Sequence, residues 1–207
     1  MKELFGAFDG ALRIQRRHFI ERRTAIESTA LFRVDSGAVG VFYETQVRPV
    51  LIEIIKPEEY GGEILYGNEL RMVSLDCETS VMSWGLRDVP EDESLEGFYR
   101  IQANALIARL ALALAEQLYQ RTIDAYLWLA RRVGEPAEAS WVVLPRYVTH
   151  ELVSQVVGTA REHVTENTTL LCRSGAIRKT KGPSGRREVL VNPGRLLELV
   201  CGRKAAA

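Results

Sequence analysis

The longest stretch without glycine or proline, residues 98–133, most limits how this chain can fold. Alanine and leucine dominate it, and a single helix of this length would be about 50 Å long. Residues that could form the contact seam of a coiled coil recur at alternating steps of four and three: Ile101, Ala105, Ala108, Leu112, Ala115, Tyr119, Thr122 and Tyr126. This heptad spacing predicts a long helix that pairs with a second copy in a homodimer. The alternative is a core helix buried on all sides.

The region before this helix, from about residue 13 to residue 84, has the pattern of short β-strands. In LFRVDSGAVGVFYE, apolar residues flank the turn signal Asp35-Ser36-Gly37. The segments VRPVLIEIIK and LRMVSLDCETSVMSWGL continue the pattern. Strands at intervals of about ten residues are typical of a small barrel or sandwich. We therefore expect a β-domain over residues 1–97.

After GEPAEAS, residues 134–140, which we interpret as a linker, two short amphipathic segments meet at Gly158. Thr149 is placed to cap the first as a helix, and Thr159 to cap the second. Gly158 permits a tight turn with a positive φ. The predicted apolar faces are Leu152, Val153, Val156 and Val157 in the first segment, and Val164, Leu170 and Leu171 in the second.

A basic hairpin, IRKTKGPSGRREVLV, follows from Ile177. From Trp141 onward the chain carries 11 Lys and Arg against 5 Asp and Glu, whereas residues 1–140 carry 16 against 22. Two helices joined at a glycine and followed by a basic hairpin are the pattern of a winged helix-turn-helix, and a basic region suits a polyanion. We therefore predict that residues 141–207 bind double-stranded DNA.

The first turn of the second segment carries the predicted base contacts. Arg161 could donate two hydrogen bonds to O6 and N7 of guanine, and Glu162 could accept one from the amino group of cytosine. The alternative is that both side chains simply lie on a solvated face. Lysines and arginines of the hairpin would hold phosphates. The other candidate DNA contacts are Thr149, His150, Thr159, His163, Thr165, Glu166, Lys179, Lys181 and Arg186.

Together these segments resemble the Crp/Fnr superfamily of bacterial transcription regulators, the cAMP receptor protein family, over nearly the whole chain. ALFRVDSGAVGVFYE resembles its strand pair, KPEEYGGEILYGNELRMVS its phosphate-binding cassette, and VTHELVSQVVGTAREHV its helix-turn-helix signature. The resemblance implies an α+β protein with a cyclic-nucleotide-binding-type β jelly roll (1–97), a dimerisation helix (98–133), a linker (134–140) and a winged helix-turn-helix domain (141–207).

The resemblance also implies a homodimer on a palindromic operator, with Arg161 and Glu162 reading bases in each half-site. Glu166 stands where the family often has arginine, so this chain need not recognise the family's usual half-site sequence. An activator of this type would also contact RNA polymerase. The residues do not indicate whether the chain activates or represses.

The resemblance places an effector pocket at Glu63, Arg71 and Arg109. Glu63 matches the family's ribose-binding glutamate and Arg71 its phosphate-binding arginine, but Met72 replaces the usual serine or threonine. In cAMP-responsive members, the corresponding part of the dimerisation helix offers polar groups to the purine. Here the only polar residue in 105–115 is Arg109. Each unpaired hydrogen-bonding group of a purine would cost about 1–3 kcal/mol. We therefore expect DNA binding without cAMP; the alternative is a regulator that requires a different small-molecule effector.

The residues that metal-binding proteins and common enzyme classes require are missing from this sequence. Cys77, Cys172 and Cys201 are scattered without a CxxC pair, which argues against zinc or an iron–sulfur cluster. His18 is the only histidine before the C-terminal region, so the histidine-based metal site of a cupin enzyme cannot form. Common catalytic motifs are also absent. Short apolar runs and the N-terminus MKELFGAFDG predict neither a membrane span nor a signal peptide. We expect a cytoplasmic protein without enzymatic activity, cofactor or metal.

Overall fold

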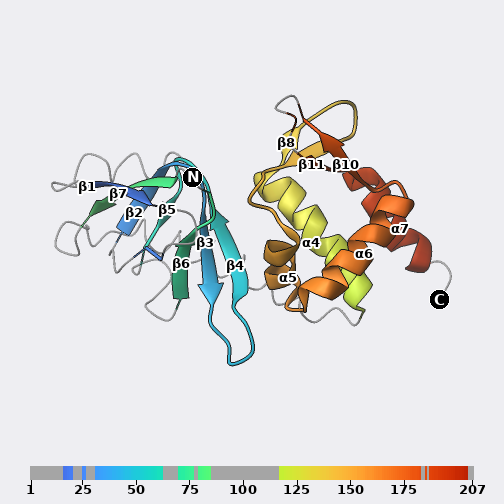
Figure 1. Ribbon diagram of the computed structural model, residues 1–207, viewed down its shortest axis with the longest axis horizontal. Coiled ribbons are helices and arrows are strands. Elements are labelled where there is room, and N and C mark those ends of the chain that lie inside the picture. Colours follow the sequence, from blue (N-terminus) through green and yellow to red (C-terminus); the bar gives the residue numbers. More distant parts are fainter. Residues whose placement is uncertain are drawn as a thin grey trace. The chain divides into compact units, whose positions relative to one another are not determined.

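The computed structural model describes residues 16–20, 25–26, 31–62, 70–76, 79–84, 117–182, 185 and 187–204. The chain divides into two compact units, residues 1–109 and 110–207 (Figure 1). In the described residues, the first unit consists of strands, and the second combines helices with a small sheet. No helix in these ranges is both long enough and apolar enough to cross a membrane.

The N-terminal unit contains two antiparallel sheets. The first has the order β1-β7-β2-β5, with strands Arg16–Ile20, Thr79–Trp84, Leu31–Ser36 and Tyr60–Gly61. The second has the order β4-β3-β6, with strands Val50–Ile55, Val39–Tyr43 and Leu70–Ser74. The short β-strands predicted for this region are therefore confirmed, and the structure shows that they pair antiparallel.

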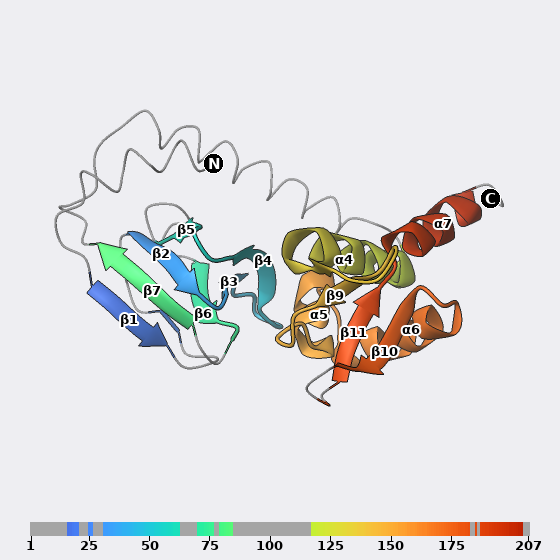
Figure 2. The same ribbon diagram turned by 90° about the horizontal axis from the view of Figure 1, so that it is seen from above.

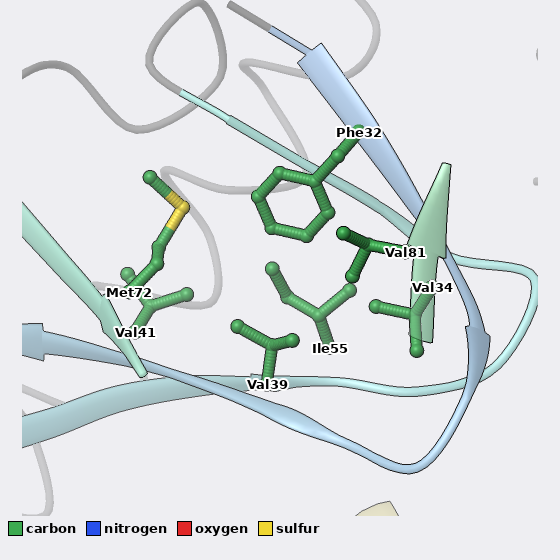
Figure 3. Close-up of a cluster of buried hydrophobic side chains, with 7 residues drawn as sticks. All are labelled: Phe32, Val34, Val39, Val41, Ile55, Met72 and Val81. Carbon is green, nitrogen blue, oxygen red and sulfur yellow. The ribbon is translucent and has the colours of Figure 1, made fainter. Parts of the chain in front are cut away.

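An apolar core forms between these two sheets (Figure 3). Its buried members are Phe32, Val34 and Val81 from the first sheet, and Val39, Val41, Ile55 and Met72 from the second. The predicted turn at Gly37 connects the sheets, because β2 ends at Ser36 and β3 begins at Val39. Gly37 has a φ of 79°, and a Cβ there would collide with Thr79. Glycine is therefore required at this position.

In the C-terminal unit, helix α4 spans Leu118–Val133 and follows Gln117, whose backbone is extended (φ −105°, ψ 126°). The expectation of one unbroken helix over residues 98–133 is therefore wrong. The break needs no glycine or proline, because any residue can adopt an extended backbone. Residues 98–116, with the seam positions from Ile101 to Ala115, lie outside the described residues.

Three more helices and a small sheet complete this unit. The helices are α5 (His150–Val157), α6 (Arg161–Arg173) and α7 (Pro193–Lys204). The sheet has the order β10-β11-β9-β8, with strands Ile177–Lys181, Arg187–Val191, Val142–Leu144 and Glu135–Pro136. Helix α4 contacts α5, α6 and α7, as Figures 1 and 2 show. The segment 134–140, expected to be a linker, instead contributes strand β8 to the sheet.

Candidate nucleic-acid interface

Helix α5 begins and ends as the sequence predicts. The side-chain oxygen of Thr149 accepts a hydrogen bond from the Leu152 amide at 3.2 Å, which caps the first turn. Gly158 ends the helix in the left-handed conformation (φ 71°, ψ 38°), and its amide donates to the Ser154 carbonyl at 2.8 Å. This conformation reverses the chain into α6 at little steric cost only for glycine. The apolar face is buried as expected: Leu152, Val153, Val156 and Val157.

Helix α6 begins at Arg161 after Ala160, so the prediction that Thr159 caps it is wrong. The side chain of Thr159 instead lies 3.2 Å from Nδ1 of His163. Leu170 was expected on the apolar face but is 47% exposed. The buried positions of α6 are Val164, Thr168 and Leu171, spaced at four and three residues. Because each residue turns the helix by about 100°, Leu171 takes the inward position and its neighbour Leu170 is excluded from it.

Two hydrogen bonds attach the inner face of α6 to α4. The Tyr126 hydroxyl lies 2.8 Å from Oγ1 of Thr168, and the Asn167 amide donates to Oγ1 of Thr122 at 2.9 Å. Thr122 and Tyr126 are buried here, at 0% and 2% exposure, within one chain. The two seam positions that we assigned to a dimer contact therefore belong to this unit's own core. Sequence reasoning missed both bonds, although polar Thr168 at a core spacing was a usable signal.

The first turns of α6 expose the residues predicted to approach bases or phosphates: Arg161, Glu162, His163, Thr165 and Glu166. Glu162 and Glu166 lie on the side opposite Val164, Thr168 and Leu171, whereas Arg161 lies on the same stripe as Thr168 and is exposed at the start of the helix. The helix thus presents a polar surface on a rigid support.

His150 connects the start of α5 with α6 and β10. Its Nδ1 lies 2.9 Å from Oγ1 of Thr165, which in turn donates to the Arg161 carbonyl at 3.0 Å. Burial lowers the pKa of His150, and the positive charges of Lys179 and Arg161 lower it further. The imidazole and two cations from different elements therefore converge at one place.

Beside α6, strands β10 and β11 form an antiparallel hairpin that runs from the Ile177–Val191 pair to the Lys181–Arg187 pair. Lys179 and Lys181 are exposed on β10. The guanidinium of Arg178 lies 4.3 Å from the ring centre of Trp141, a cation–π contact that tethers the hairpin to the segment before β9. Arg186 lies outside the described residues.

Of the predicted effector residues, only Arg71 lies within the described residues. It is on β6, where alternation places Met72 in the core and Arg71 on the outer side, 54% exposed. Its guanidinium pairs with Glu44 at 3.3 Å, a partner that the sequence did not indicate. Glu63 and Arg109 lie outside the described residues. In the ranges that the structure covers, no group of His, Cys, Asp and Glu is arranged to hold a metal ion.

No protein-family model matches the sequence, and no curated protein matches it. Solved structures do resemble the chain. A Crp/Fnr-family transcriptional regulator from Thermus thermophilus is 21% identical, with a TM-score of 0.67 over 89% of this chain and 97% of that one. A cyclic nucleotide-binding domain protein from Listeria monocytogenes is 13% identical, with a TM-score of 0.65 over 93% and 97%.

A third similar structure is the c-di-GMP-responsive global regulator CLP of Xanthomonas campestris. It is 16% identical, with a TM-score of 0.65 over 92% of this chain and 99% of that one. Together these structures show that the chain has the fold of Crp/Fnr-type regulators, across nearly its whole length.

Proposed function

We propose that this chain is a sequence-specific, DNA-binding transcription regulator of the Crp/Fnr type. The observation that carries the proposal is that α6 is anchored by its middle and exposed at its start. Thr168 and Asn167 anchor the helix to α4, while Arg161 and Glu162 are exposed in its first turn. The fold shared with known regulators supports the same function.

In this proposal, residues 141–207 act as a winged helix-turn-helix, extended by the packing of α4. Helix α6 enters the major groove, where Arg161 reads guanine and Glu162 reads cytosine. Exposed Lys179 and Lys181 of the hairpin hold phosphates and fix the position of α6 without reading sequence. The hairpin is then the wing.

The proposed regulator binds a palindromic site as a homodimer through the seam positions from Ile101 to Tyr119. Thr122 and Tyr126 are left out of this contact, because they are used within the chain. Replacing Ala108 and Leu112 by glutamate should place charges in that contact. Sedimentation should then show monomers, and persistence of the dimer would place the interface elsewhere.

As an activator, the proposed regulator would also contact RNA polymerase in the cytoplasm; no enzymatic activity is proposed.

We further propose that the chain binds DNA without cAMP in its jelly-roll domain, residues 1–97. Two observations support this: Arg71 is exposed and already paired with Glu44, and Met72 occupies the core rather than a polar pocket. A second candidate is control by another small molecule, since a similar protein is described as responsive to c-di-GMP. Calorimetric titration with cAMP, c-di-GMP and other nucleotides separates the two: micromolar binding of cAMP contradicts the first, and micromolar binding of c-di-GMP or another nucleotide favours the second.

The experiment that tests the function is selection of duplex DNA from a random pool by the purified chain, with no nucleotide added. Enrichment of a two-fold symmetric site, with half-sites about one helical turn apart, is the expected result. The Arg161→Ala variant is the matched control, because Arg161 is exposed and its truncation removes one predicted base contact. If the folded dimer enriches no site without nucleotide, effector-free binding is wrong; if it still enriches none after each candidate effector is added, the DNA-binding function is overturned.

A further inference from the structure

His150, Thr165 and Arg161 form a continuous hydrogen-bonded chain at the rim of the proposed DNA surface. We propose that His150 binds a DNA phosphate through Nε2 in its protonated form, so that DNA binding takes up a proton at this residue. The inference rests on the proposed function and adds a residue role and a proton to it.

The hydrogen bonds determine which ring nitrogen is available. A threonine hydroxyl has one hydrogen, and Thr165 donates it to the Arg161 carbonyl at 3.0 Å. In the bond of 2.9 Å to His150, Thr165 must therefore accept, and Nδ1 of His150 must carry the hydrogen. The neutral imidazole then has its lone pair at Nε2. Nε2 can donate to a phosphate oxygen only after it gains a proton.

The surroundings of His150 disfavour its protonated form while DNA is absent. Partial burial lowers its pKa, and the positive charges of Lys179 on β10 and Arg161 on α6 lower it further. The acid nearest along its own helix, Glu151, is exposed to solvent. Arg161 and Lys179 are also the residues proposed to meet DNA. A phosphate placed among these groups neutralises the repulsion and favours the imidazolium, because opposite charges within about 4–6 Å raise the pKa of histidine.

Proton uptake makes DNA affinity depend on pH. If one proton is bound with the DNA, the association constant rises by up to about tenfold for each unit that pH falls, within the interval between the pKa values of the free and bound forms. Because the pKa of free His150 is lowered, that interval begins below the ordinary value for histidine.

The experiment measures binding of the selected DNA site by fluorescence anisotropy from pH 6 to pH 8 at constant salt. His150→Asn keeps an amide N–H near Nδ1 for the bond to Thr165 but cannot titrate. His163→Asn removes the other histidine of this surface and is the matched control. We expect affinity to increase severalfold toward pH 6 in the wild type and in His163→Asn, whatever their absolute affinities, and to stay flat in His150→Asn.

Calorimetry in two buffers of different ionisation enthalpy gives the number of protons taken up directly. Uptake by the wild type that disappears in His150→Asn supports the inference. A pH slope that persists in His150→Asn, or that disappears in His163→Asn, overturns it while the DNA-binding function stands. Absence of any selected site, with or without effector, is the separate outcome in which the proposed function itself fails. Thermal unfolding of each variant checks that it is folded.

Discussion

The hydroxyl of Tyr126 lies 2.8 Å from Oγ1 of Thr168, with both side chains buried, and this bond joins α4 to the inner face of α6. Thr168 donates its own hydrogen to the Val164 carbonyl at 2.6 Å, so Tyr126 is the donor to Thr168. The outer face of α6 is thus oriented by a residue 35 positions earlier than Arg161 in the chain. Stability and DNA recognition are expected to be coupled through this pair.

Removing one partner of this pair should have unequal effects. Tyr126→Phe leaves an acceptor unused and should lower the free energy of unfolding by about 1 kcal/mol. Thr168→Val leaves the Tyr126 hydroxyl buried without an acceptor and should cost more, about 1–3 kcal/mol. Denaturant unfolding of the two variants and of the double variant measures this. Equal losses, with no recovery in the double variant, would contradict the assigned direction of the bond.

Tyr126 should also reduce stability at alkaline pH. Burial raises the pKa of Tyr126 to about 12, from an ordinary value of 10. Its contribution to stability is complete below pH 10 and is lost as pH rises through 12, by about 3 kcal/mol in total. The wild type should therefore lose its advantage of about 1 kcal/mol over Tyr126→Phe above pH 10 and be the less stable of the two at pH 11.5 in denaturant titrations. A constant difference across that range would show that the phenol ionises freely.

Gly158→Ala should destabilise the C-terminal unit through backbone strain alone. The φ of 71° is unfavourable for alanine, but a Cβ at this position meets no atom within 4 Å. The expected loss is about 1–2 kcal/mol. Gly158→Asn should lose less, because asparagine tolerates the left-handed conformation better. Thermal or denaturant unfolding decides between them; a loss much larger than this range in both variants would indicate a packing contact instead.

Arg161→Ala should weaken binding to the selected site by about 1–3 kcal/mol and relax the preference at one base pair in each half-site. The reason is the loss of two hydrogen bonds to one guanine. Competition binding against single-base variants of the site measures the effect. Unchanged specific affinity would mean that α6 is docked differently.

Lys181→Ala should weaken binding to all DNA sequences to a similar extent. Lys181 is exposed on the proposed wing, where it would contact a phosphate rather than a base. Losing one phosphate contact should lower the slope of log affinity against log salt by about 0.9. Titrations at several salt concentrations, on the selected site and on random DNA, provide the comparison. A change confined to the selected site would indicate base reading by the hairpin.

Local chemistry was enough to predict several parts of this structure. The alternation around Asp35-Ser36-Gly37 predicted two strands and their turn, and Thr149 and Gly158 predicted both ends of α5. In each case the signal is a short-range requirement: period-two burial, a capping oxygen, or a backbone conformation that favours glycine. The polar outer face of α6 was also predicted from its residues.

Other features depended on which surfaces meet in the folded chain. An extended backbone at Gln117 is open to any residue, so residues 98–133 carry no local sign that α4 begins at Leu118. Thr122 and Tyr126 fit a dimer seam as well as a core, and only the packing of α6 assigns them to the core. Helical spacing shows that a face is buried but not what buries it, because every partner surface imposes the same period. The sequence therefore determined the strands, the hinge at Gly158 and the exposed face of α6, while tertiary contacts decided which segment covers each apolar stripe.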